Sequence, residues 1–199
     1  MDTLVLLRSR LRTAVPRDLP SDSPPSSFRR AAVLVPLFES GGAAYLLLTK
    51  RTEKVEYHKG QISFPGGRQE DGDADLLETA LRETHEEIGL APSAVEVWGR
   101  LDEIEVIASG FAVTPFVGLV PPPVGLRPNP DEIAEIVAVP LASFLDPANL
   151  RVEHVLREGR SVELVYYENI PHLVWGATAR IIKGLVELLA PESPPGGER

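Results

Sequence analysis

Three glutamates stand close together in the segment RETHEEIGL, residues 82–90. If this segment is helical, Glu83, Glu86 and Glu87 lie three and four residues apart and share one side of the helix. Like charges this close repel one another, and a hard divalent cation bound through oxygen relieves the repulsion. The spacing therefore predicts a site for Mg2+ or Mn2+, although a run of charges is more often a solvated helix face.

The elements that must position these glutamates can be predicted from the flanking residues. We expect a helix over residues 74–88, with Asp73 as its N-cap and Gly89 just after its last turn. Arg82 precedes the first glutamate and can pair with a carboxylate, holding it in the conformation of a ligand. The 3.6-residue period predicts that one side of the helix packs on a sheet through Leu77, Ala80, Leu81, Thr84 and Ile88.

Apolar, partly β-branched runs before and after this helix predict strands. Residues 31–38 and 44–51 flank the turn Ser40-Gly41-Gly42 and predict a hairpin. The remaining expected elements are strands at 95–100, 113–120 and 132–141, a second hairpin from 151–157 and 162–170, and a helix at 176–190. Because helices and strands do not alternate regularly, we expect an α+β fold with a mixed or mostly antiparallel sheet.

Composition and charge limit the classes of protein to which the chain can belong. Its 199 residues are 43% hydrophobic and 25% charged, as in a single globular domain. The net charge of -9 argues against a nucleic-acid partner. The absence of cysteine excludes disulfides and thiolate metal sites and suits the cytoplasm. We expect neither a signal peptide nor membrane binding.

The ends of the chain differ in composition from its middle. Leu4, Leu7, Leu11 and Val15 fall at helical spacing and predict an amphipathic helix that packs on the domain. We expect an N-terminal helix and a Pro/Ser-rich linker in residues 1–27, a domain in residues 28–190 and a flexible tail in residues 191–199.

The segment from Phe64 to Leu90 resembles the Nudix box, which is written G-x5-E-x7-R-E-U-x-E-E-x-G-U with U a bulky aliphatic residue. The matching residues are Gly67, Arg82, Glu83, Glu86, Glu87, Gly89 and Leu90. The interval from Gly67 to Arg82 is one residue longer than usual, so Ala74 stands at the position of the first glutamate, and Thr84 replaces an aliphatic residue. The resemblance implies a Nudix fold, with a mixed sheet between helices, and metal-dependent hydrolysis of a diphosphate.

The preceding residues 46–67, LLLTKRTEKVEYHKGQISFPGG, resemble the extension found in Nudix enzymes of the coenzyme A pyrophosphatase type. Residues 109–118, 129–141 and 174–181 are similar to that subfamily as well. This resemblance implies cleavage of coenzyme A, or a derivative, to 4'-phosphopantetheine and adenosine 3',5'-bisphosphate. The alternatives are another nucleotide substrate (ADP-ribose, a dinucleoside polyphosphate or a modified nucleoside triphosphate) and a nucleotide-binding module without catalysis.

The predicted site residues follow from the motif and its extension. Arg82 and the three glutamates are the predicted catalytic residues, and the glutamates are the predicted metal ligands. Substrate binding is expected from Arg51, His58, Gln61, Gly66, Gly67 and Arg68. Arginine can bind phosphate through two hydrogen bonds. Glu132 is a candidate general base, and Glu83, Glu86 and Glu135 are further candidates; the alternative for Glu132 is an exposed strand residue. We expect Trp98 and Trp175 in the core, a small-molecule partner, and a monomer or a homodimer.

Overall fold

The structure is a computed structural model that describes residues 3–19, 28–54, 59–107, 109–157 and 160–190. Its helices are α1 (Thr3–Thr13), α2 (Leu76–Ile88), α3 (Leu141–Leu145) and α4 (Gly176–Glu187), with short 3-10 turns at Pro92–Ala94 and Pro147–Asn149. Its strands are β1 (Arg29–Ser40), β2 (Ala43–Arg51), β3 (Ile62–Ser63), β4 (Gly66–Arg68), β5 (Glu96–Arg100), β6 (Ile104–Val106), β7 (Phe111–Leu119), β8 (Ile133–Pro140), β9 (Leu150–Arg157), β10 (Arg160–Tyr167) and β11 (Val174–Trp175).

The main sheet is built around β1. This strand pairs antiparallel with β2, as the hairpin at Gly41-Gly42 predicted, and parallel with β7 on its other side. β8 pairs with β2, while β5 and β6 pair with β7. The sheet is therefore mixed, and the predicted α+β class is confirmed. Within the described residues, each predicted strand has a counterpart whose bounds differ from the prediction by a few residues.

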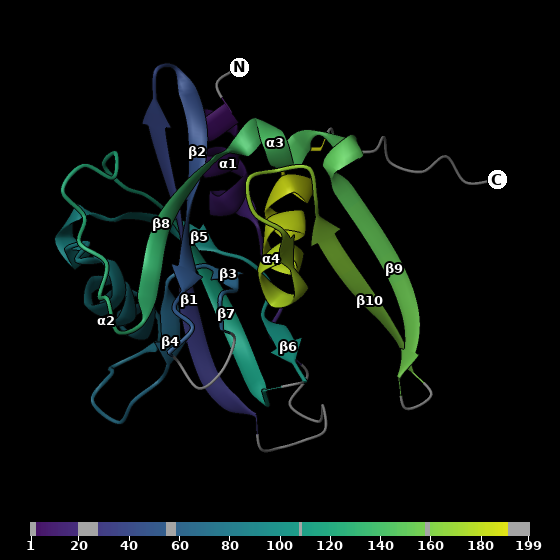
Figure 1. Ribbon diagram of the computed structural model, residues 1–199, viewed down its shortest axis with the longest axis horizontal. Coiled ribbons are helices and arrows are strands. Elements are labelled where there is room, and N and C mark those ends of the chain that lie inside the picture. The colour runs from purple at the N-terminus through teal and green to yellow at the C-terminus, as the bar shows by residue number, and fades with distance from the viewer. Residues whose placement is uncertain (1–2, 20–27, 55–58, 108, 158–159, 191–199) are drawn as a thin grey trace.

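Alternation along β1 gives the sheet two apolar faces. Leu34 and Phe38 pack with Ile88 of α2 on one face. Val35 and Leu37 belong to the larger core on the other face, which also contains apolar residues of α1 and α4. Figure 1 shows α2 on one side of the sheet and α1 and α4 on the other, so the sheet lies between two helical layers.

Helix α2 differs from the prediction at its start and on its buried side. Asp75, not Asp73, is the N-cap: its side chain accepts a hydrogen bond from the N–H of Glu78 at 2.8 Å. Gly89 ends the helix, as predicted. Its φ of 72° is the left-handed conformation that glycine adopts readily. The buried residues of α2 are Thr79, Ala80, Thr84, Glu87 and Ile88, whereas Leu77 and Leu81 are only half-buried.

The N-terminal helix packs on the main domain through Leu4, Leu7 and Leu11, which are buried in the larger core. Val15 does not continue this stripe, because α1 ends at Thr13 and Val15 is exposed. The start of the expected linker is also anchored rather than frayed, since the side chain of Arg17 bonds Asp102 at 2.7 and 2.9 Å.

The second predicted hairpin forms a sheet of its own instead of extending the main one. β9, β10 and β11 make a three-stranded antiparallel sheet, and Figure 1 shows β9 and β10 beyond α4. Val165 and Tyr167 of β10 are fully buried in the larger core, and α4 ends at Glu187 rather than at residue 190. None of the helices in the described residues is both long and apolar enough to span a membrane.

The two tryptophans have different environments. Trp98 lies in the larger core, as predicted. Trp175 is 45% exposed, so the prediction that it is a core residue is wrong. It ends the short strand β11, whose neighbour Val174 is the buried residue of the pair.

Candidate active site

The carboxylate of Glu87 lies inside the protein, with only 3% of its side chain exposed. It accepts hydrogen bonds from the backbone N–H of Gly66 at 3.2 Å and from Nη1 of Arg51 at 3.3 Å. Burial raises the pKa of Glu87 to about 8, and the nearby Arg51 and the Gly66 bond offset this effect only in part. Helix α2, strand β2 and the glycine turn therefore meet at one desolvated carboxylate.

Glu83 stands one turn earlier on α2 and is held against the same glycine turn. A Cβ atom at Gly67 would lie 2.6 Å from each carboxylate oxygen of Glu83, so only glycine leaves room for this side chain. Desolvation raises the pKa of Glu83, because a charged carboxylate is less stable away from water. The FPGG turn thus leaves space for an acidic side chain beside its backbone.

Arg82 connects the acidic residues, which confirms the predicted pairing of Arg82 with a carboxylate. Its Nη1 donates to Oε1 of Glu83 and to Oε2 of Glu86, each at 3.1 Å. Its Nη2 donates to the backbone carbonyl of Arg68 at 3.2 Å and to Asp73 at 3.0 Å. The guanidinium group therefore links the helix to the loop that precedes it.

Asp73 is a residue whose role was predicted incorrectly from the sequence. Its side chain accepts from Nε of Arg82 at 2.8 Å, from the hydroxyl of Thr79 at 2.9 Å and from the N–H of Glu70 at 2.9 Å. These bonds hold the pKa of this nearly buried carboxyl well below its usual range. A signal was present: Asp73 is six residues after Gly67, which is the spacing of the first glutamate counted from the glycine of the box.

Glu132 comes from a distant part of the chain, just before β8, and lies near Glu83 and Glu87. Its Oε2 is 4.0 Å from Nη2 of Arg51, and its negative charge contributes to the raised pKa of both Glu83 and Glu87. The side chain is 44% exposed. Glu132 is therefore at the site and open to solvent, while its role as a base stays a prediction.

The three glutamates of α2 do not converge as closely as their spacing predicted. Arg82 draws Glu83 and the 52%-exposed Glu86 to one side, whereas Glu87 turns inward toward Arg51. As they stand, no three acidic or histidine side chains in the described part of the chain are arranged to hold a metal ion.

The donor set nevertheless fits a hard divalent cation in its chemistry. Two desolvated carboxylates with raised pKa values repel each other and Glu132, and a cation would relieve that repulsion. To bind an ion together, Glu83 and Glu87 would exchange contacts with arginine for contacts with the metal. Glu83 and Glu87 therefore fit a divalent metal ion once their contacts with arginine are exchanged for contacts with the ion.

In a comparison with known protein families, residues 28–158 of the chain match the Nudix domain family. The chain belongs to the Nudix hydrolase family. It is 40% identical over 163 residues to NudL of Shigella flexneri serotype 5b, named an uncharacterized Nudix hydrolase, covering 81% of this chain and 83% of that protein. NudL of Escherichia coli O1:K1, with the same description, is 41% identical over 159 residues, covering 79% and 81%.

Solved structures of similar proteins include RenU, a Nudix hydrolase from M. smegmatis (26% identity, TM-score 0.49, 58% of this chain and 73% of that one). A C. elegans Ap4A hydrolase has 20% identity and a TM-score of 0.48, over 57% of this chain and 81% of that one. The family match and the sequence relatives, rather than these structures, confirm the predicted Nudix family and support a pyrophosphatase.

The remaining predicted substrate residues of this Nudix hydrolase have different surroundings. The backbone carbonyl of Gln61 accepts from the N–H of Arg51 at 3.0 Å, which ties the extension to the end of β2. Arg68 is exposed at the end of β4. His58 lies outside the described residues, so its predicted role in substrate binding stays a prediction.

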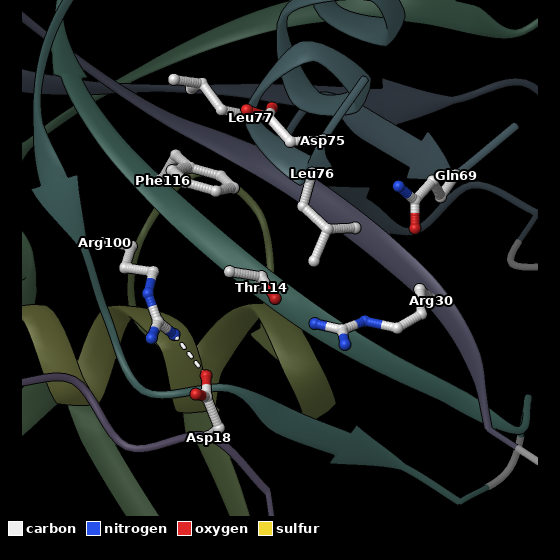
Figure 2. A pocket seen from close by; sticks show the side chains of 9 residues that line it. All are labelled: Asp18, Arg30, Gln69, Asp75, Leu76, Leu77, Arg100, Thr114 and Phe116. Atoms are coloured by element: carbon white, nitrogen blue, oxygen red, sulfur yellow. Dashed lines mark ion pairs between the residues drawn. The ribbon is translucent and has the colours of Figure 1, made fainter. Parts of the chain in front are cut away.

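A cavity of about 540 Å³ lies beside the start of α2 (Figure 2). Thr114 and Phe116 of β7 and Arg100 of β5 line it, together with residues from the first turn of α2. β7 and β2 flank β1 on opposite sides, and none of the three glutamates lines the cavity. The cavity is therefore separate from the three glutamates of α2.

Buried Glu103 lies beside this cavity and was not predicted. It accepts from Nη2 of Arg30 at 3.0 Å, from the hydroxyl of Thr114 at 3.1 Å and from the N–H of Leu19 at 3.1 Å. Its partners come from three distant segments, so spacing along the chain carried no signal for it. These bonds make Glu103 a structural link between the sheet and the segment after α1.

Proposed function

We propose that this Nudix hydrolase cleaves the diphosphate linkage of coenzyme A or a coenzyme A derivative, giving 4'-phosphopantetheine and adenosine 3',5'-bisphosphate. The observation that carries the proposal is the pair of desolvated carboxylates, Glu83 and Glu87, beside the Gly66-Gly67 turn and Arg51. The choice of substrate rests on residues 46–67, which resemble the coenzyme A pyrophosphatase extension and supply both Arg51 and the glycine turn.

The metal in this proposal is Mg2+ or Mn2+, and Glu83, Glu86 and Glu87 would hold it. When bound, it would supply positive charge to the diphosphate oxygens and acidify a water molecule. Arg82 keeps Glu83 and Glu86 on the same side of α2, and the N–H of Gly66 orients Glu87. These contacts hold the donor side chains near the glycine turn, and the arginine contacts of Glu83 and Glu87 would be exchanged for metal contacts when the ion binds.

The proton released when water attacks phosphorus needs an acceptor. Glu132 is suited to this task because it is partly open to solvent and stands near Glu83 and Glu87. Glu83, Glu86 and Glu135 are the other candidates from the sequence. Among these, Glu83 has the raised pKa that makes a carboxylate a better proton acceptor near neutral pH.

Arg51 is our proposed contact for the substrate phosphates. Its buried Nε has no hydrogen-bond partner in the described structure, while Nη1 contacts Glu87. When the glutamates bind metal, the guanidinium group can turn its unused donors to phosphate oxygens. The other proposed substrate contacts within the described residues follow Arg51 in the chain and are Gln61, Gly66, Gly67 and Arg68.

A substrate panel tests the proposed function. The protein is incubated with Mg2+ or Mn2+ and, in parallel, with coenzyme A, its disulfide and acyl forms, ADP-ribose, a dinucleoside polyphosphate and a modified nucleoside triphosphate. We expect adenosine 3',5'-bisphosphate from the coenzyme A compounds at the highest kcat/KM. If none of them is turned over, the substrate proposal is wrong, and the best alternative substrate replaces it.

A second test separates catalysis from nucleotide binding without hydrolysis. Glu86→Gln and Glu87→Gln each remove a proposed metal ligand while keeping the size of the side chain. Turnover should fall by about a hundredfold or more in each, with the unfolding temperature still showing a folded domain. Survival of full activity in both variants would mean that the metal site is elsewhere.

A further inference from the structure

Strand β9 forms one edge of the small sheet, in which the strand order is β11-β10-β9. Within the residues that the structure describes, its outer edge pairs with no other strand. Figure 1 shows β9 on the side of the small sheet that faces away from the main sheet. The strand is eight residues long, so it presents a regular row of backbone donors and acceptors to solvent.

The hydrogen-bond pattern shows which residues face that outer edge. The N–H of Glu168 donates to the carbonyl of Asn149 at 2.8 Å, directly before the paired strands begin. Bonded and non-bonded pairs alternate in an antiparallel ladder. Arg151 and Glu153 therefore use their backbone groups toward β10, while those of Val152 point outward.

Within one chain Arg151 already pairs with Glu153 and Glu168, and the same side chains are also complementary to a second copy of this edge. In an antiparallel pair with a two-fold axis at Val152, Arg151 stands opposite Glu153 of the other chain, and Glu153 stands opposite Arg151. Val152 meets Val152, with 36% of its surface exposed in the single chain. Opposite charges across strands stabilise pairing, and apolar contact at the axis adds to it.

We propose that β9 pairs with β9 of a second copy of this chain, so that the two small sheets form one six-stranded sheet across a two-fold axis. Three hydrogen-bonded residue pairs would form across the interface: 150 with 154, 152 with 152, and 154 with 150. Together they would supply about six backbone hydrogen bonds. The interface is isologous, since each chain contributes the same residues.

Other registers of the same two strands are less favourable. An axis at Glu153 would place Glu153 opposite itself, and an axis at His154 would place Arg151 opposite Arg157. An axis at Val155 would leave only two bonded pairs, because its outward residues within the strand are His154 and Leu156. Both the opposing charges and the number of hydrogen-bonded pairs therefore favour a two-fold axis at Val152.

Sedimentation equilibrium or light scattering across a range of protein concentrations tests the proposal. We expect the mass to rise toward that of two chains as the concentration increases, with a dissociation constant in the micromolar range typical of small interfaces. A mass of one chain at every concentration would overturn the proposal and mean that the charges on β9 keep this edge from pairing.

Two variants test the residues that the proposed β9–β9 interface would use. Val152→Pro removes an N–H that faces the outer edge and is not used by β10, and Glu153→Arg places arginine opposite arginine. Each should remain a monomer where the parent chain is a dimer, with a thermal transition that confirms folding. A parent dimer that persists in both variants would rule out pairing through β9.

Charge exchange and a control variant test the register. Arg151→Glu and Glu153→Arg, each monomeric alone, should form a mixed dimer when combined, because every opposing pair then joins an acid and a base. Leu156→Lys changes an 81%-exposed residue outside the paired segment and should leave the dimer intact. Dissociation by Leu156→Lys would contradict the axis at Val152.

Discussion

Asp73 holds Arg82 through two parallel hydrogen bonds, from Nε to Oδ1 at 2.8 Å and from Nη2 to Oδ2 at 3.0 Å. The same guanidinium group contacts Glu83 and Glu86. The loop before α2 therefore sets the position of the arginine that aligns two proposed metal ligands.

Replacing Asp73 by Asn should remove one charge of a nearly buried ion pair and leave Arg82 poorly oriented. We expect the free energy of unfolding to fall by about 2–4 kcal/mol and kcat/KM to fall as well. Because the pKa of Asp73 is lowered in the folded state, its stabilising effect exists above its ordinary pKa of 3.8 and is lost as the pH falls further. Chemical denaturation at neutral and acidic pH measures this, with the exposed Asp71→Asn as control. Equal losses in both variants would contradict a special role for Asp73.

Gly67→Ala should disturb Glu83 directly, since the new Cβ would meet both carboxylate oxygens at 2.6 Å. The obstacle is the end of a side chain and not backbone, so the fold should survive while Glu83 moves. We expect kcat to fall by roughly a hundredfold, with a small change in unfolding temperature. Gly72→Ala is the matched control, because its Cβ would meet nothing within 4 Å. Normal activity in Gly67→Ala would show that the position of Glu83 is not critical.

Glu87 should make the metal-free protein less stable as the pH rises. Its pKa is about 8 when folded and near 4.5 when unfolded, so the folded state binds more protons between these values. Stability is therefore lost progressively from about pH 4.5 to pH 8. Glu87→Gln should raise the unfolding temperature in EDTA at pH 8 by several degrees, corresponding to roughly 1–3 kcal/mol, with a smaller effect at pH 5. An equal effect at both pH values would argue against the raised pKa.

Arg51→Gln should weaken substrate binding more than it changes the chemical step. Loss of charged hydrogen bonds to phosphate corresponds to about 1.5–3 kcal/mol, so KM should rise roughly ten- to a hundredfold. Steady-state kinetics measure this, with Lys50→Gln as the control for loss of one positive charge from the neighbouring position. A fall in kcat at unchanged KM would show instead that Arg51 acts mainly by orienting Glu87.

Elements whose pattern is local could be predicted from the sequence. The hairpin at Gly41-Gly42, the glycine end of α2 and the neighbouring positions of Glu83 and Glu86 all depend on residues a few places apart. The sequence also contained the family motif and its extension. The order of elements along the chain could not show that β9 and β10 form a separate sheet. An alternating apolar pattern indicates a strand but not the strand with which it pairs.

The sequence by itself determined that three glutamates stand on one helix after a glycine turn, because helical spacing is a local property. Only the tertiary structure decided that Glu87 is buried while Glu86 is exposed, and that Glu132 and Arg51 lie beside them. It also decided that Asp73 holds Arg82 while Asp75 caps the helix. Burial and long-range pairing depend on how the sheet, the helix and the loops pack together, and that packing sets the environment of each carboxylate.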